Sequence, residues 1–171
     1  MTTDYNALKD SIEQALRAEF NDHIISSTLD YDFPVFTVKS DAIHQVLAYL
    51  KNTEGLGFHF LTTLCGIHMP DQAGAEFGVM YQLHNMHSNQ RVRIKTWLSK
   101  DNVHVPTASD LWPAANWMER QEFDFFGIKF TGHPNLTRIL NMDEMNYYPM
   151  RKEYPLEDGS RDDKNDKMFG R

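Results

Sequence analysis

The residues best suited to chemistry lie between 112 and 140, where charged and aromatic side chains are interspersed. Glu119 and Asp124 stand among Trp, Met and Phe residues, and His133 follows them. Two carboxylates and an imidazole are side chains used in general acid and base catalysis, so a small free-standing hydrolase is one hypothesis. The same pattern suits a helix with paired charges that packs on more than one side, partly against another chain. We prefer the packed helix, because the pattern implies no nucleophile or activated water.

Histidines and the single cysteine form a second set of candidates. His84 and His87 are three residues apart, a spacing that on a helix would share one face and could hold zinc. The alternation around them predicts a strand, where residues three apart point to opposite faces, so we do not expect a metal site. Cys65 near His68 suggests a thiol nucleophile, but a small buried residue at a strand end is the better interpretation. No P-loop, Gly-x-Gly-x-x-Gly or Gly-x-Ser-x-Gly motif occurs, so no nucleotide site is expected.

Composition narrows the classes of protein further. A chain of 171 residues, 41% of them hydrophobic, corresponds to about one domain with a core. Its 17 Lys and Arg against 24 Asp and Glu give a net charge of −7, which argues against a sequence-independent grip on nucleic acid. One cysteine allows no internal disulfide and no iron–sulfur cluster, and it favours a reducing compartment. The first residues lack the pattern of a signal peptide, and no apolar run approaches a membrane span.

Periodicity predicts three helices. Apolar residues three and four apart predict a helix over 5–20, capped by Asp4. Ser40 or Asp41 is expected to cap a second helix, and a third is expected over about 112–126, with Pro113 in its first turn and Gly127 at its end. The second helix should bury the four apolar residues of one face: Ile43, Val46, Leu47 and Leu50.

Strands are expected between the second and third helices and on either side of them. They are predicted at 33–38, 58–65, 77–83, 92–97 and 128–130. In 58–65, Phe58, Phe60, Thr62 and Leu64 should share one side. The polar link 87–90 predicts an antiparallel hairpin. Because the elements do not repeat as strand–helix–strand, we predict an α+β fold over residues 1–130, with helices packed on a mainly antiparallel or mixed sheet.

Beyond the domain the character of the chain changes. Residues 131–171 form a motif loop followed by a tail in which eleven of the seventeen residues 151–167 are charged. Such a segment buries too little apolar surface to fold alone, so we expect an extended tail that is mobile in the free chain and wraps a partner.

Three blocks of residues follow one another in this region. The first is Glu-Arg-x-x-x-Asp-Phe-Phe-Gly-Ile at 119–128, the second runs from Gly-His-Pro to Arg-Ile-Leu at 132–140, and the third is Pro-Met-Arg-Lys-Glu-Tyr-Pro-Leu at 149–156. Together they resemble the signature of the C subunit of proton-translocating NADH:quinone oxidoreductase, respiratory complex I. Gln121 and Thr137 depart from that signature, which usually has Glu and a basic residue there. The matching site residues are Glu119, Arg120, Asp124, Gly127, Gly132, His133, Pro134, Arg138, Pro149, Arg151, Lys152, Tyr154 and Pro155.

The resemblance implies interface residues rather than catalytic ones. It implies a non-redox subunit of the hydrophilic arm, on the cytoplasmic side of the membrane, held there by its partners. The D, B and I subunits of complex I would be those partners, and FMN, iron–sulfur clusters and quinone would reside in partner subunits and not in this chain. A homologous subunit of an energy-converting hydrogenase, or of a quinone reductase fed by ferredoxin or deazaflavin, is the nearest alternative. A generic interaction module is a further one.

Overall fold

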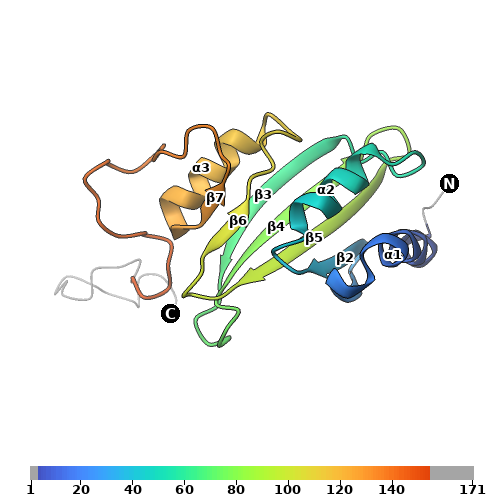
Figure 1. Cartoon of the computed structure of the whole chain (residues 1–171), viewed down its shortest axis with the longest axis horizontal. Coiled ribbons are helices and arrows are strands. Elements are labelled where there is room, and N and C mark those ends of the chain that lie inside the picture. The colour runs from blue at the N-terminus through green and yellow to red at the C-terminus, as the bar shows by residue number, and fades with distance from the viewer. Residues whose placement is uncertain (1–3, 155–171) are drawn as a thin grey trace, which may run out of the picture.

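The computed structural model of the protein describes residues 4–154 as three helices and two sheets (Figure 1). In chain order the elements are α1 (Tyr5–Phe20), a short 3-10 turn (Asn21–His23), β1 (Ile24–Asp30), β2 (Phe33–Val38), α2 (Ile43–Asn52), β3 (Phe60–His68), β4 (Phe77–Asn85), β5 (Gln90–Leu98), β6 (His104–Pro106), α3 (Ala115–Phe126) and β7 (Lys129–Thr131). Within the described range, no helix is both long and apolar enough to cross a membrane.

The main sheet has five strands in the order β1-β2-β5-β4-β3. Every neighbouring pair is antiparallel except β2 and β5, which are parallel. The strands β6 and β7 form a separate parallel pair. The predicted α+β fold with a mixed sheet is therefore confirmed, as is the β4–β5 hairpin.

The first two helices bury the faces that their periodicity predicts. Asp4 caps α1 by accepting the backbone N–H groups of Asn6 and Ala7. The predicted apolar face of α2 is buried throughout. The predicted cap of α2 is wrong: Ala42 occupies the N-cap position without a side-chain hydrogen bond, and the Asp41 carboxylate instead lies 3.4 Å from His23 Nδ1.

Strand β3 departs from the simple alternation that its sequence predicts. Its pairing with β4 shifts register between Leu61 and Thr63, because a bulge adds a residue there. Leu61 and Leu64 are therefore buried, whereas Phe60 is 49% exposed. The prediction that Phe60 and Leu64 share one side is wrong. Strands β1 and β6 were not predicted. Strand β1 is rich in Ser and Thr and lies at the edge of the sheet, where a strand needs fewer apolar side chains than in the centre.

All three helices lie on one face of the main sheet. Tyr81 and Leu83 of β4 point into the core on that face, and Ile94 and Val92 of β5 lie opposite them. From α1, Glu13 accepts the Ser27 hydroxyl of β1, and from α3 a carboxylate reaches β3 on the same face. Figure 1 shows the helices on one side of the strands, with α3 next to β3.

Candidate interface site around helix α3

Helix α3 carries the first sequence block and buries three carboxylates. It begins at Ala115, with Pro113 in the turn before it, and ends at Gly127, which has a φ of +75° and donates its N–H to Phe123 O. Glycine adopts this left-handed conformation without steric cost, which explains why the helix ends there. The predicted C-terminal stop is confirmed.

Glu119 lies fully buried and holds the turn that follows β6. Its carboxylate accepts the Thr107 hydroxyl at 2.5 Å and the Ala108 backbone N–H at 2.6 Å. Burial raises the pKa of Glu119 to about 7, although both hydrogen bonds favour the charged form. No Lys or Arg among residues 4–154 pairs with it, so the expectation of an ion-paired helix is wrong for this residue.

Glu122, one turn further along α3, attaches the helix to the sheet. Its carboxylate accepts the backbone N–H of Gly66 in β3 at 2.7 Å. A Cβ on Gly66 would lie 2.7 Å from this carboxylate and 2.8 Å from the Phe126 ring, so only glycine permits the close approach. Burial raises the pKa of Glu122 to about 7 as well.

Asp124 binds the second sequence block. Its carboxylate is fully buried and lies 2.6 Å from Arg138 Nη1. It also accepts the backbone N–H groups of residues 139–141 and the Asn141 side-chain amide. Burial opposes the charged form, but these hydrogen bonds and Arg138 outweigh it and hold the pKa of Asp124 well below its usual value. The expected ion pair is confirmed at this position.

Arg138 links α3 to the segment that follows it. Besides Asp124, its guanidinium donates to the carbonyls of Met145 at 2.7 Å and Tyr147 at 3.1 Å. The ring of Tyr148 lies 5.3 Å from its central carbon, within range of a cation–π contact. We call residues 132–154 the C-terminal strap, because these contacts tie them across α3.

Arg120 faces the strap without a carboxylate partner among the described residues. It donates to the carbonyls of Thr137 and Arg138 at 3.1 and 3.0 Å, and its guanidinium lies over the half-exposed Trp117 ring. Three separate groups on the strap and helix thus fix the orientation of Arg120. A Lys at this position would lack the fork that reaches both carbonyls.

His133 belongs to a turn rather than to a catalytic pair. Its Nδ1 accepts the Asn135 backbone N–H, and its Nε2 lies 3.1 Å from the carbonyl of Asn116 in α3. The ring therefore carries its proton on Nε2. Gly132, at φ +85°, and the exposed Pro134 shape the turn on either side of it.

The third block returns the strap to the end of α3. Arg151 donates to the Phe126 carbonyl at 2.7 Å and lies between the rings of Phe77 and Tyr148, 4.8 and 4.6 Å from their centres. A Cβ on Gly127 would come within 2.6 Å of both Arg151 and Tyr148. Gly127 therefore serves two purposes: it ends the helix and it leaves room for the strap.

The strap also reaches the end of β3. The Lys152 backbone N–H donates to Nδ1 of His68, whose pKa is lowered by burial. The ring of Tyr154 lies against that of Tyr147, and Pro149 is half-buried. Pro155 lies outside the described residues, as does the rest of the tail. The expectation of a tail that is mobile in the free chain is wrong for residues 141–154, because Asn141, Met150, Arg151 and Lys152 bind α3 and β3 of their own chain. For residues 155–171, a tail that wraps a partner stays a prediction.

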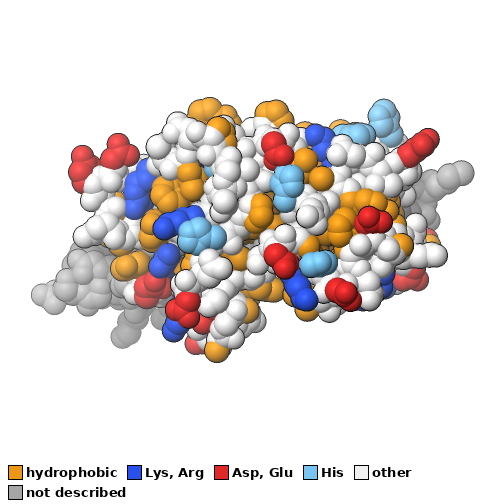
Figure 2. Space-filling view, in the orientation of Figure 1, with side chains coloured by type: hydrophobic (Ala, Val, Ile, Leu, Met, Phe, Trp, Pro, Cys, Tyr) orange, Lys and Arg blue, Asp and Glu red, His pale blue; other side chains and the backbone are white. Residues whose placement is uncertain are grey.

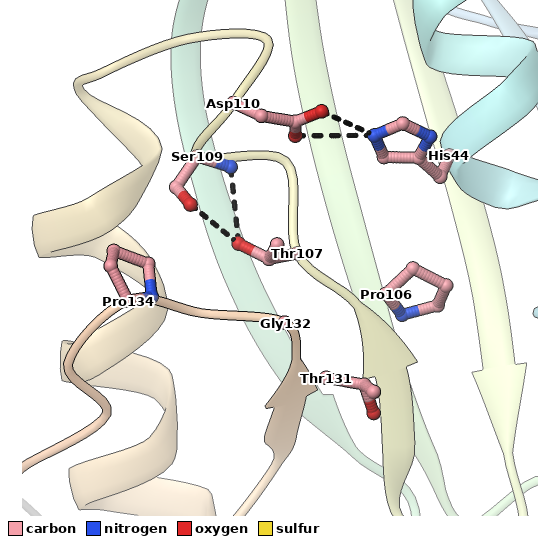
Figure 3. Close-up of a pocket in the computed structure, with 8 residues that line it drawn as sticks. All are labelled: His44, Pro106, Thr107, Ser109, Asp110, Thr131, Gly132 and Pro134. Carbon is pink, nitrogen blue, oxygen red and sulfur yellow. Dashed lines mark hydrogen bonds and ion pairs between the residues drawn. The ribbon is translucent and has the colours of Figure 1, made fainter.

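A hydroxyl-lined pocket of about 530 Å³ lies beside Thr107, whose hydroxyl binds Glu119 (Figure 3). Thr107 and Ser109 line one side of it, and Nε2 of His44 in α2 lies 2.9 Å from the Asp110 carboxylate. Gly132 and Pro134 complete the lining, together with Pro106 and Thr131. Sequence reasoning missed His44 and Asp110, because 66 residues separate them and neither belongs to a motif.

The structure does not bring Glu119, Asp124 and His133 together. Each is hydrogen bonded to a different partner, and no bond among residues 4–154 joins two of the three. The same residues contain no group of three or more His, Cys, Asp or Glu arranged to hold a metal ion. The geometry therefore gives the hydrolase hypothesis no assembled acid–base site.

Comparisons with known proteins place the chain in a family. Residues 36–160 match the family model described as the respiratory-chain NADH dehydrogenase 30 kDa subunit. A curated relative from Acidothermus cellulolyticus, named as the C subunit of NADH-quinone oxidoreductase, is 36% identical over 79% of this chain and 70% of its own length. The chain spans 48% to 66% of the length of the relatives that follow it.

Two solved structures share the fold. The trypsin-resistant fragment of Nqo5 has a TM-score of 0.64 and 25% identity, covering 74% of this chain and 98% of the fragment. A chain of the archaeal membrane-bound sulfane sulfur reductase has a TM-score of 0.72 and 24% identity, covering 88% of this chain and 86% of its own. The matched family model covers all three sequence blocks that the structure joins around α3. The chain therefore belongs to the 30 kDa subunit family of respiratory-chain NADH dehydrogenase, the family of the C subunit of NADH-quinone oxidoreductase.

Proposed function

We propose that this chain is a structural, non-redox subunit in the hydrophilic arm of a proton-translocating NADH:quinone oxidoreductase. The holoenzyme would transfer electrons from NADH through FMN and iron–sulfur clusters in other subunits to quinone. This chain would hold neighbouring subunits together and carry no cofactor itself. Its neighbours would be the D, B and I subunits, and it would lie on the cytoplasmic side of the membrane through them.

One observation carries the proposal: the three sequence blocks form a single anchored surface. Asp124 of the first block binds Arg138 of the second, and Arg151 of the third binds the end of the helix that holds Asp124. A catalytic site would leave a reactive group available. Here Asp124, Arg138 and Arg151 instead bind backbone groups and hold the chain in place. This supports a structural role for the three blocks, in which they fix the shape of the surface formed by α3 and the strap.

The strap presents large apolar side chains to the outside although its backbone is anchored. Leu140 and Met142 are 65% and 69% exposed, and Met150 is 49% exposed. Figure 2 shows hydrophobic and basic side chains intermingled on the side of the molecule that holds α3. Apolar side chains held on a rigid backbone are typical of protein interfaces, because little ordering entropy remains to be lost on binding.

A homologous subunit of a related membrane complex is the second candidate. The sulfane sulfur reductase chain shares this fold and belongs to a respiratory membrane complex. For this second candidate, the complex would be an energy-converting hydrogenase or a quinone reductase fed by ferredoxin or deazaflavin. Co-purification of a flavin-bearing NADH-oxidising subunit would favour the first candidate over the second.

The test is purification of the tagged full-length chain from membranes, with identification of the proteins that accompany it. We expect the D, B and I subunits at equal stoichiometry. The variant with Leu140→Ser and Met142→Ser should retain far fewer of them, because it removes two exposed apolar anchors. Met86→Ser is the matched control: Met86 is 64% exposed but lies in the β4–β5 turn. A wild-type chain that purifies alone and shows turnover would overturn the proposal.

A further inference from the structure

The face of the main sheet opposite the helices carries a row of basic side chains along its central strand. On β5, Arg91, Arg93 and Lys95 alternate with residues that point into the core. Side chains two residues apart on a strand are about 7 Å apart and project to the same side. The row therefore crosses the middle of a sheet face on which none of the three helices packs. We call this side of the sheet the open face.

Two of the three basic side chains on the open face, Arg93 and Lys95, are held in position by neighbouring side chains. Arg93 Nε donates to Gln82 of β4 at 3.1 Å, and its guanidinium lies 5.3 Å from the centre of the Phe33 ring. Lys95 lies 3.4 Å from the Asp30 carboxylate. No carboxylate among residues 4–154 lies within ion-pair distance of Arg91 or Arg93. In a chain with a net charge of −7, this local excess of positive charge stands out.

Apolar side chains flank the basic row. Trp97, the next outward-facing residue on β5, lies against Gly78, where an added Cβ would be only 2.8 Å from the indole ring. Met80 of β4 and Ile67 of β3 are half-buried nearby in the strand register, and Phe60 is 49% exposed. A sheet face that stays in water is normally polar. Arginine, aromatic and Met side chains together are the composition of an interface core.

We propose that the open face docks an acidic segment of a partner subunit, whose carboxylates bind Arg91 and Arg93 and whose apolar residues contact Trp97 and Met80. Charge complementarity identifies the partner chemistry, since the guanidinium fork binds carboxylates in two-point geometry. The inference rests on the proposed function, because it requires a complex of several subunits. It adds a second interface, separate from the strap.

The only cysteine of the chain is a probe built into the open face. Cys65 is half-buried on β3, opposite Met80 in the strand register. The rate at which a maleimide alkylates Cys65 can be measured by mass spectrometry of this chain, first in the isolated chain and then in the complex purified from membranes. We expect alkylation at least about tenfold slower in the complex, which corresponds to about 1.4 kcal/mol of protection. Equal rates would mean that nothing covers the face.

Charge reversal tests the partner chemistry. Arg91→Glu changes an exposed residue, and the double variant with Arg93→Glu extends the change along the row. Lys129→Glu is the matched control, since Lys129 is exposed on β7, outside the main sheet. We expect incorporation into the complex to fall with Arg91→Glu, to fall further with the double variant, and to be unchanged in the control. Circular dichroism of the isolated chains separates this effect from unfolding.

A zero-length carbodiimide identifies the occupant, because it joins an amine only to a carboxylate in contact with it. Lys95 should cross-link to an Asp or Glu of a different subunit, and the Lys95–Asp30 cross-link within the chain serves as the internal control. Cross-links from Lys95 to a second copy of this chain would overturn the inference. Nucleic acid bound to the open face in the purified complex would overturn it as well. If the wild type enters no complex, the proposed function fails. If it enters normally and the Arg91→Glu variant does too, only the open-face inference fails.

Discussion

Replacing Asp124 with Asn should detach the strap while leaving the shape of the side chain almost unchanged. Asp124 is fully buried and is the acceptor for Arg138, for three consecutive backbone N–H groups at 139–141 and for the Asn141 amide. Asn carries no charge and can offer only one acceptor oxygen. Whichever way its amide is turned, an NH₂ group faces donors that had been bound.

The expected loss follows from these contacts. Removing one partner of a buried ion pair costs about 3–5 kcal/mol, because the other charge is left buried and unpaired. Part of that cost is recovered if Arg138 swings into solvent, and Arg138 is already partly exposed. We therefore expect a loss of about 3 kcal/mol in the free energy of unfolding at pH 7.

Urea unfolding followed by tryptophan fluorescence measures the loss, and amide exchange at 139–141 shows where it arises. The pKa of Asp124 is lowered in the folded chain. Its contribution is therefore complete above the ordinary Asp value of about 3.9 and is lost as the pH falls towards its folded value. The difference between wild type and variant should thus be constant from about pH 5 to 8 and shrink below about pH 4.

Asp143→Asn is the matched control, because Asp143 is an exposed acid of the same strap. It should change the stability by less than about 0.5 kcal/mol. A loss under about 1 kcal/mol in Asp124→Asn, with exchange at 139–141 unchanged, would refute the reasoning. That result would mean that the strap holds its place without the buried charge.

Three other predictions follow from the contacts of α3 and the strap. Burial raises the pKa of Glu119 and Glu122 to about 7, so their contribution to stability is complete below the ordinary Glu value of about 4.3 and lost as the pH rises through 7. Stability should fall over that range in the wild type and fall less in Glu122→Gln, as measured by urea unfolding at pH 4.5, 6 and 7.5; identical slopes would contradict this. Gly127→Ala should lower stability by about 1–3 kcal/mol from backbone strain, plus the clash with the strap. Gly74→Ala has a similar φ of +80° but open space around it, and a calorimetric Tm as low as that of Gly127→Ala would remove the clash from the explanation. The amides of 150–152 should be protected from exchange in the isolated chain, since they donate to groups of α3 and β3 and within the strap; fast exchange there would mean that only a partner orders this part of the strap.

The helices could be predicted because their signals are local. The face of α2 and the end of α3 follow from spacing and from one glycine, which neighbouring residues suffice to interpret. The bulge in β3 could not be predicted, because it exists only in relation to the partner strand β4. Strand β1 was missed for a similar reason: its Ser- and Thr-rich sequence lacks an apolar stripe, and its pairing with β2 defines it.

The residues of the site also fall into those that the sequence identifies and those whose contacts only the fold reveals. Asp124 and Arg138 were identified through the motif, yet their direct contact depends on a turn of the strap that no periodicity encodes. The motif does not single out Glu122, although its position three residues after Glu119 places it on the buried side of the same helix. The sequence connects His68 only with the nearby thiol of Cys65, whereas in the fold its ring binds a backbone N–H of a residue 84 positions away. Contacts of that kind become visible only when the fold is known.

The parallel pairing of β2 with β5 has a consequence for the order in which the chain assembles. During synthesis, residues 33–38 emerge long before residues 90–98, and β2 has only β1 as a neighbour until β5 is made. Contacts between residues far apart in the chain form late, because closing the loop between them costs entropy first. The nascent chain therefore exposes an unpaired strand edge for the time needed to add some fifty residues, and at the usual rate of about 5–20 residues per second this lasts several seconds. Chaperone capture would protect the chain most effectively in that interval, before β5 closes the sheet.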